Sequence, residues 1–184
     1  MDWMFSIKNG DKMKSLKSLF VVATGLLFAA CGGTAENIKE GMAAPQFSLN
    51  DQNGAKITLA EFKGKNPVIL YFYPKAGTAG CTKQACGIRD NFKKFEEAGI
   101  KVLGISVDDA TSLKEFENEQ KLNFPLLSDV DKKVSEDYGV LNKLGVSSRI
   151  TFIIDKSGNI AHIIRDVDVS THAQVVFDLA KKLI

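Results

Sequence analysis

The sequence predicts an α/β fold in which a mixed central sheet is covered by helices on both faces, with a β-hairpin at the start of the domain. Two observations indicate this class. Apolar runs of strand length alternate with segments of helical periodicity, which is typical of parallel strands joined by helices. Near each end of the domain, two strand-like segments flank a short turn, which predicts antiparallel pairing there.

The first predicted hairpin lies in QFSLNDQNGAKITL, where apolar and polar residues alternate on both sides of Asn53-Gly54. Asn-Gly is a preferred dipeptide for a two-residue hairpin turn. The run NPVILYFY is apolar throughout and predicts a buried central strand. A helix that begins near Cys81 comes next, and KVLGISVD then predicts a second buried strand.

The second half of the domain continues the alternation. We expect a helix in DATSLKEFENEQK from Asp109 or Thr111, a short strand in FPLLSD, and a short helix in KKVSEDYG that Gly139 closes. RITFIIDKSGNIAHII predicts a hairpin that turns at Ser157-Gly158-Asn159. STHAQVVFDLAKKLI predicts a terminal amphipathic helix with Ser170 as its N-cap. We expect one domain without internal repeats.

The first 30 residues predict a signal peptide. Lys14 and Lys17 precede an apolar run of 12 residues, Leu19–Ala30, and Cys31 follows. This run has the length of a signal-peptide apolar region and is shorter than the roughly 20 residues that a membrane-spanning helix needs. Residues 1–12 resemble neither a signal nor a domain, so Met13 is a candidate for the true start.

The segment FAAC resembles the lipobox of bacterial lipoproteins, although Phe28 stands where those proteins usually have leucine. The resemblance implies cleavage before Cys31 and a lipid on its thiol. The protein would then be an exported lipoprotein, anchored in a membrane and facing the periplasm. Residues 31–42 are expected to form a tether, followed by the domain at 43–184. The alternative is an uncleaved N-terminal anchor helix.

The charge balance argues against a nucleic-acid partner. Removal of residues 1–30 takes away four lysines and two aspartates, so the formal net charge falls from +2 to zero. A neutral domain without a basic cluster offers no electrostatic attraction to a phosphate backbone.

Two cysteines, Cys81 and Cys86, remain in a compartment where disulfides form. On a helix that begins near Cys81, the thiol of Cys81 shares a side with Ala85, Ile88 and two phenylalanines, while Cys86 lies about 140° away on the charged side. Five residues of helix separate the two Cα atoms by roughly 8–9 Å, beyond the ~7 Å limit for a disulfide. The spacing therefore predicts a redox cycle in which the helix start unwinds.

The loop before Cys81 suits a reactive thiol. A helix N-terminus offers unpaired N–H groups and partial positive charge, which favour a thiolate. Gly77 and Gly80 let the backbone approach a small ligand, and Thr78 can turn its hydroxyl toward the thiolate. Pro74 ends the preceding strand.

The segment YFYPKAGTAGCTKQACGIRDNF resembles the active site of the peroxiredoxins. Their pattern Pro-x-x-x-Thr-x-x-Cys is met by Pro74, Thr78 and Cys81, and a second cysteine five residues on is similar to the bacterioferritin-comigratory (PrxQ-type) subfamily. The resemblance extends from about Met42 to the C-terminus. One departure is Ala79, which replaces the proline usual in TPGCT.

A second departure is the segment between Tyr138 and Arg149, which is shorter than in many relatives. The resemblance implies a thioredoxin-like fold and a thiol peroxidase that needs no metal or organic cofactor. It also implies that Cys81 is the peroxidatic cysteine, Cys86 the resolving cysteine and Arg149 the catalytic arginine. The implied substrates are hydrogen peroxide and alkyl hydroperoxides, the implied reductant is a thioredoxin-like protein, and the expected state is a monomer.

Several alternatives use the same residues. The two thiols could form a structural disulfide or stay buried and inert. Some thioredoxin-fold lipoproteins bind copper through two close cysteines and a distant histidine, and His162 and His172 are available, although three intervening residues are usual there and this chain has four. A disulfide-exchange protein would want Cys-x-x-Cys, which is absent. Otherwise we expect both histidines on the surface.

Overall fold

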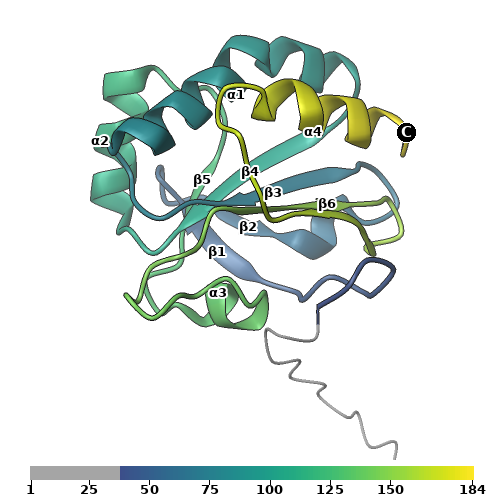
Figure 1. Cartoon of the computed structure of the whole chain (residues 1–184), viewed down its shortest axis with the longest axis horizontal. Helices are drawn as coiled ribbons and strands as arrows, with labels where there is room; N and C mark the ends of the chain where they lie inside the picture. The colour runs from purple at the N-terminus through teal and green to yellow at the C-terminus, as the bar shows by residue number, and fades with distance from the viewer. Residues whose placement is uncertain (1–37) are drawn as a thin grey trace, which may run out of the picture. The chain divides into compact units, whose positions relative to one another are not determined.

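A computed structural model describes residues 38–184 (Figure 1). Its sheet has seven strands in the order β2-β1-β5-β4-β3-β6-β7. The strands are β1 (Ser48–Asp51), β2 (Lys56–Thr58), β3 (Val68–Phe72), β4 (Lys101–Ser106), β5 (Leu126–Ser128), β6 (Ile150–Ile154) and β7 (Ile160–Ile164). The helices are the 3-10 helix η2 (Leu59–Phe62) and the α-helices α1 (Ala79–Glu97), α2 (Ala110–Gln120), α3 (Lys133–Asp137) and α4 (His172–Lys181).

The sheet is mixed, as the sequence predicts. β3, β4 and β5 are parallel to one another, as expected for strands joined by helices. β6 runs antiparallel to β3 on its other side, and the hairpins β1–β2 and β6–β7 close the two edges. Every residue of β3 and β6 is buried, which explains why both read as continuous apolar runs.

The two faces of the sheet carry separate cores. α1, α2 and α4 cover one face (Figure 1), where their apolar residues pack on Ile69 and Tyr71 of β3. α3, η2 and the N-terminal segment cover the other face, packing on Leu70 and Phe72. Successive residues of β3 thus point to opposite cores. The predicted fold class, a thioredoxin-like mixed sheet between helices with an N-terminal hairpin, is confirmed.

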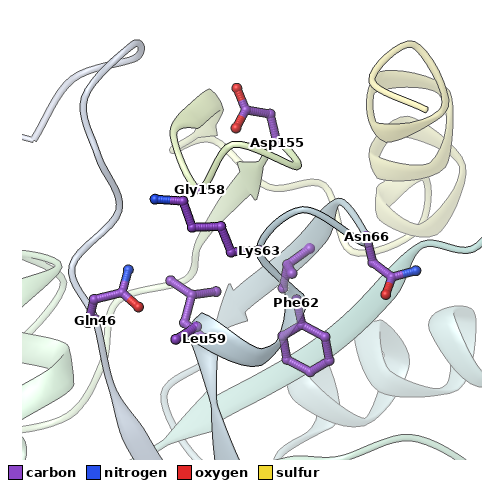
Figure 2. A pocket seen from close by; sticks show the side chains of 9 residues that line it. Gln46, Leu59, Phe62, Lys63, Asn66, Asp155 and Gly158 are labelled. Carbon is purple, nitrogen blue, oxygen red and sulfur yellow. The ribbon is translucent and has the colours of Figure 1, made fainter.

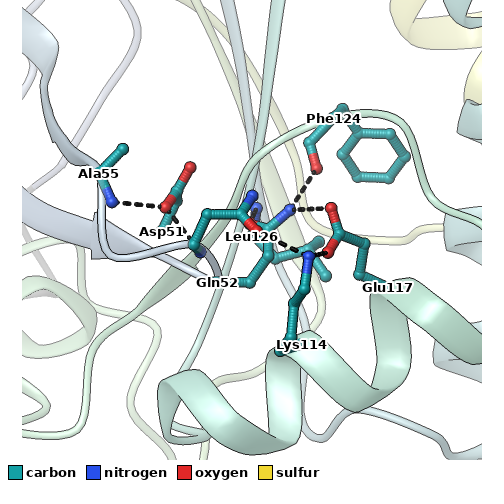
Figure 3. Close-up of polar contacts among 8 residues, drawn as sticks. Asp51, Gln52, Ala55, Lys114, Glu117, Phe124 and Leu126 are labelled. Carbon is teal, nitrogen blue, oxygen red and sulfur yellow. Dashed lines mark hydrogen bonds and ion pairs between the residues drawn. The ribbon is translucent and has the colours of Figure 1, made fainter.

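A polar cluster fixes the first hairpin to α2 (Figure 3). The Gln52 side chain donates to Glu117 at 2.9 Å and accepts from the backbone N–H of Leu126 at 2.8 Å. Lys114 donates to Asn53 at 2.7 Å and also pairs with Glu117. Because Gln52 is buried, its two bonds satisfy groups that would otherwise be costly to bury. The hairpin, β5 and α2 are therefore held as one unit.

The structure gives the starts of α2 and α4 more closely than the sequence did. α2 begins at Ala110, and Asp109 caps it by accepting a hydrogen bond from the Ser112 backbone N–H at 2.9 Å. The N-cap of α4 is Thr171, not Ser170. The Ser170 hydroxyl instead donates to the Asp168 carboxylate at 2.6 Å in the preceding turn, which uses the side chain that would have capped the helix.

The folded domain extends at least to Ile38, so residues 38–42 are not part of a free tether. Ile38 is buried in the core on the α3 side of the sheet. The Gly41 N–H donates to the Ile160 carbonyl at 2.7 Å, and the Ile160 N–H donates to the Met42 carbonyl at 2.8 Å. The predicted signal peptide and Cys31 lie outside the described residues. Within residues 38–184, no helix is long and apolar enough to span a membrane.

Candidate active site

The loop after β3 sets up the first turn of α1. β3 ends at Phe72, and Pro74 follows where the chain leaves the sheet. Gly77 has a φ of 74°, in the left-handed region that glycine adopts without steric cost. Thr78 is the extended N-cap of α1, and its carbonyl accepts from the Thr82 N–H at 2.8 Å. Cys81 is thereby placed in the first turn, as predicted.

Asp108, which the sequence analysis did not single out, fixes this loop from the end of β4. Its carboxylate accepts from the Ala76 N–H and from the Ser106 hydroxyl, both at 2.8 Å. Its carbonyl accepts from the Ser128 hydroxyl on β5 at 2.7 Å. Through Asp108, the loop is therefore connected by hydrogen bonds to the two neighbouring strands β4 and β5.

Strand pairing brings Arg149 to the thiol of Cys81. Ile150, the first residue of β6, is the register partner of Phe72, the last residue of β3. Arg149 precedes β6 directly, so it stands beside the loop that leads to α1. Its Nη2 donates to Cys81 Sγ at 3.3 Å, and Cys81 is only 2% exposed. The structure thus places two of the predicted site residues in contact, 68 positions apart in the chain.

Gly80 makes room for this contact. A Cβ at position 80 would lie 3.2 Å from Arg149 Nη2 and 3.9 Å from Cζ. A methyl group there would push the guanidinium by a few tenths of an ångström. Gly80 therefore allows the Arg149 side chain to approach the helix backbone closely. The sequence had suggested that a ligand would approach there.

Thr78 lies at the same helix end and is exposed. Its hydroxyl donates to the Lys75 carbonyl at 3.0 Å, within the turn of the loop. The hydrogen bonds of residues 38–184 do not include the predicted one from Thr78 to the Cys81 thiol. The Thr78 oxygen keeps lone pairs that can accept a hydrogen bond from a bound molecule.

Cys86 lies in the contact between α1 and α2 rather than on the open charged side that the helical projection predicted. It is half-buried, and its thiol donates to Gln120 Oε1 at 3.7 Å. Arg89, one turn further, donates to the backbone carbonyl of Gln120 at 2.5 Å. Both cysteines are free and belong to one continuous helix, so the two thiols stay separate while that helix is regular.

A buried polar chain lies behind Arg149. Arg149 Nη1 donates to Gln84 Oε1, the Gln84 amide nitrogen lies 3.2 Å from His172 Nδ1, and His172 Nε2 lies 2.9 Å from the Thr151 hydroxyl. Gln84 is 1% exposed and His172 is 2% exposed. The prediction of a surface position was therefore wrong for His172. Burial, together with the nearby charge of Arg149, lowers the pKa of His172 to about 4, so its imidazole is neutral at physiological pH.

The sequence did contain a signal for this burial. On α4, His172 lies four and eight positions before Val176 and Ala180, which are both buried. On α1, Gln84 shares the inward side with Ile88 and Phe95. Both polar residues thus stand on apolar helix faces, where a polar side chain needs a partner.

The structure also bears on the copper alternative. Both ring nitrogens of His172 are engaged by Gln84 and Thr151 and are not directed at the cysteines. His162 lies on β7, with its Nδ1 4.0 Å from a carboxylate oxygen of Glu40. Across residues 38–184, histidine, cysteine, aspartate and glutamate side chains form no cluster of three that could hold a metal ion.

A separate pocket lies elsewhere on the domain, between η2 and the β6–β7 turn (Figure 2). Leu59 and Phe62 form part of its wall, with Lys63, Asn66 and Asp155 at its rim. Neither cysteine nor Arg149 lines it. It is not the place where the thiol chemistry occurs.

Comparison with known proteins identifies the family of the chain. Residues 41–163 match the AhpC/TSA family. Peroxiredoxin Bcp of Escherichia coli (strain K12) is 44% identical over 152 residues, which cover 79% of this chain and 97% of that protein. The chloroplastic Peroxiredoxin Q of Oryza sativa subsp. japonica is 46% identical over 142 residues, covering 76% of this chain and 63% of that protein.

Solved structures are similar as well. Peroxidoxin BcpB from Mycobacterium tuberculosis superposes with a TM-score of 0.74 at 33% identity, covering 80% of this chain and 99% of that one. The Bacterioferritin Comigratory Protein of Xanthomonas campestris superposes with a TM-score of 0.72 at 28% identity, covering 78% of this chain and 98% of that one.

The chain therefore belongs to the AhpC/TSA family, and it has a thioredoxin-like fold. Within that family it is a peroxiredoxin of the Bcp/PrxQ type, a thioredoxin-dependent peroxidase that reduces peroxides by the atypical two-cysteine mechanism typical of that type.

The Gly80 contact yields a first prediction. Gly80→Ala should slow oxidation of Cys81 by peroxide about tenfold, because the added methyl group displaces the Arg149 guanidinium from its position beside Cys81 Sγ. Complete loss of such a donor lowers a reaction rate by about 10²–10³. Stopped-flow kinetics with hydrogen peroxide measures the rate. Gly87→Ala on the same helix is the matched control, since its Cβ would meet only Ala173 Cβ at 3.9 Å. Equal oxidation rates in the two variants would show that Gly80 has no such role.

Proposed function

We propose that Cys81 is the peroxidatic cysteine and Cys86 the resolving cysteine, acting on hydrogen peroxide and alkyl hydroperoxides. The observation that carries the assignment is the Arg149 Nη2 donor 3.3 Å from Cys81 Sγ, at the N-terminus of a helix that also contains Cys86. A guanidinium is always charged and has five N–H donors in one plane, so it can hold a thiolate and a peroxide oxygen together.

The first step oxidises the thiol. The Cys81 thiolate attacks one peroxide oxygen, the O–O bond breaks, and sulfur gives up two electrons to become a sulfenic acid. The second oxygen leaves as water or an alcohol after it takes up a proton. Arg149 stabilises the charge that develops on the departing oxygen, Thr78 lies at the helix end where it can accept a hydrogen bond from the substrate, and Pro74 directs the chain into this loop.

The second step needs movement. Cys81 and Cys86 are separated by five residues of α1, or roughly 8–9 Å between Cα atoms, and a disulfide needs less than ~7 Å. The first turns of α1 unwind, the Cys86 thiol attacks the Cys81 sulfur, and water leaves as the disulfide forms. A thioredoxin-like dithiol protein then reduces this disulfide and is itself oxidised.

We also propose that the enzyme acts as a monomer, since both cysteines of the cycle lie on one helix of one chain.

The proposed location is the periplasmic side of a membrane, with a lipid on Cys31. The support is the apolar run Leu19–Ala30 after two lysines and the FAAC segment that ends it. Six residues separate Cys31 from Ile38, the first described residue of the domain. A chain of that length spans at most about 25 Å, so the domain would be held close to the lipid surface.

Separate substitution of the two cysteines tests the assignment. Cys81→Ser should abolish peroxide consumption, because it removes the nucleophile. Cys86→Ser should complete one oxidation and then accumulate sulfenic acid, because nothing resolves it. Stopped-flow kinetics gives the first step, and mass spectrometry with a sulfenic-acid probe gives the product. Loss of the first oxidation step in Cys86→Ser alone would reverse the two roles.

The anchor has its own test. Cys31→Ser should release the protein from the membrane fraction into the soluble fraction, because a thioether to diacylglycerol can no longer form. The wild-type protein, treated in parallel, should stay with the membranes. Unchanged membrane retention of Cys31→Ser would instead indicate an uncleaved N-terminal helix.

A further inference from the structure

We propose that His172 is a positioning residue for the reaction at Cys81, acting through Gln84 to orient the Arg149 guanidinium. This rests on the proposed role of Cys81 as the peroxidatic cysteine. His172 lies on α4, which packs against α1, while Thr151 lies on β6 and Arg149 directly precedes that strand. Hydrogen bonds connect five side chains in the order Cys81, Arg149, Gln84, His172 and Thr151.

The direction of the hydrogen bonds is set by Arg149. A guanidinium can only donate, so the group of Gln84 that faces Arg149 is its carbonyl oxygen. The Gln84 NH₂ group then faces His172 Nδ1 at 3.2 Å, and Nδ1 must accept. The proton of a neutral imidazole is left on Nε2, where it is donated to the Thr151 hydroxyl at 2.9 Å. Every bond in the chain runs outward from Arg149.

This direction restricts His172 to one form, the neutral imidazole with its proton on Nε2. A proton on Nδ1 would face the Gln84 NH₂ group. Rotation of the Gln84 amide would relieve that conflict only by turning NH₂ toward the guanidinium. Burial favours the neutral form, and so does the nearby cation Arg149. The neighbouring Tyr71 ring, 6.0 Å away between centroids, is itself neutral.

The consequence is a fixed guanidinium. Arg149 uses Nη1 on Gln84 and Nη2 on Cys81, so its plane is set by two points. Gln84 can hold one of them only while its own amide is held, and His172 supplies the acceptor that does so. Loss of that acceptor leaves Gln84 free to rotate and Arg149 with one fixed contact, at a site where small displacements of a reacting group are costly.

Three variants at position 172 separate the two bonds of the imidazole. His172→Asn carries an oxygen near the position of Nδ1 and can still accept from Gln84. His172→Gln carries its amide near the position of Nε2 and can still reach Thr151. His172→Leu removes both. We expect the rate of Cys81 oxidation by hydrogen peroxide to fall about tenfold in His172→Gln and His172→Leu, and to stay within about twofold in His172→Asn.

A second electrophile distinguishes positioning from general stability. Iodoacetamide alkylates Cys81 without an O–O bond for the guanidinium to polarise, so its rate should fall less than the peroxide rate in His172→Gln and His172→Leu. A purely structural role predicts equal loss of both reactions and no advantage of Asn over Gln. The proposal would be overturned by an unchanged ratio of the two rates in His172→Leu. Equal peroxide rates in His172→Asn and His172→Gln would overturn it as well.

Wild-type protein provides a test that does not depend on the folding of any variant. Long-range ¹H–¹⁵N correlation spectra of the imidazole should show the neutral Nε2-protonated tautomer of His172 between about pH 5.5 and 8. A proton on Nδ1, or an imidazolium, would contradict the direction of the hydrogen bonds. Failure of these tests would leave the Cys81 and Cys86 assignment intact, because that assignment depends on the serine variants alone.

Discussion

The placement of both cysteines on one helix is the constraint on which the rest of the site depends. The N-terminus of α1 places Cys81 beside the partial positive charge of the helix end and in contact with Arg149, and the same helix keeps Cys86 out of reach. In the proposed cycle, the reaction with peroxide therefore uses the regular helix, and disulfide formation uses an opened one. Cys81 is buried, so in the proposed cycle the opening also exposes it to the reductant.

The contacts that hold α1 fall into two groups with different parts in this cycle. Around Cys81, Arg149 and the polar chain behind it connect α1 to β6 and α4. Around Cys86, Gln120 on α2 accepts from the thiol and from Arg89. Gln52 and Lys114 in turn hold α2 to the sheet edge, so this second group has a rigid support (Figure 3). In the proposed cycle, both groups of contacts weaken before the two sulfur atoms meet.

Much of this could be predicted from local patterns. The central strands are apolar runs, the hairpins have their turn residues, and the periodicity after Cys81 indicates a helix that separates the two thiols. Arg149 came from family resemblance, because nothing local shows that β6 pairs with β3. Asp108 and His172 were missed because their partners lie on other elements, and a polar residue on an apolar face reveals burial but not a partner.

Hydrogen exchange on the reduced and the disulfide-bonded protein tests the central constraint most directly. We expect the amides of about Thr82 to Arg89 to be protected in the reduced protein and to lose protection on oxidation, because that part of α1 has unwound. The second half of the helix, which packs through Phe95, should stay protected in both states. Unchanged protection of residues 82–89, in protein whose Cys81–Cys86 disulfide is shown by mass spectrometry, would contradict it.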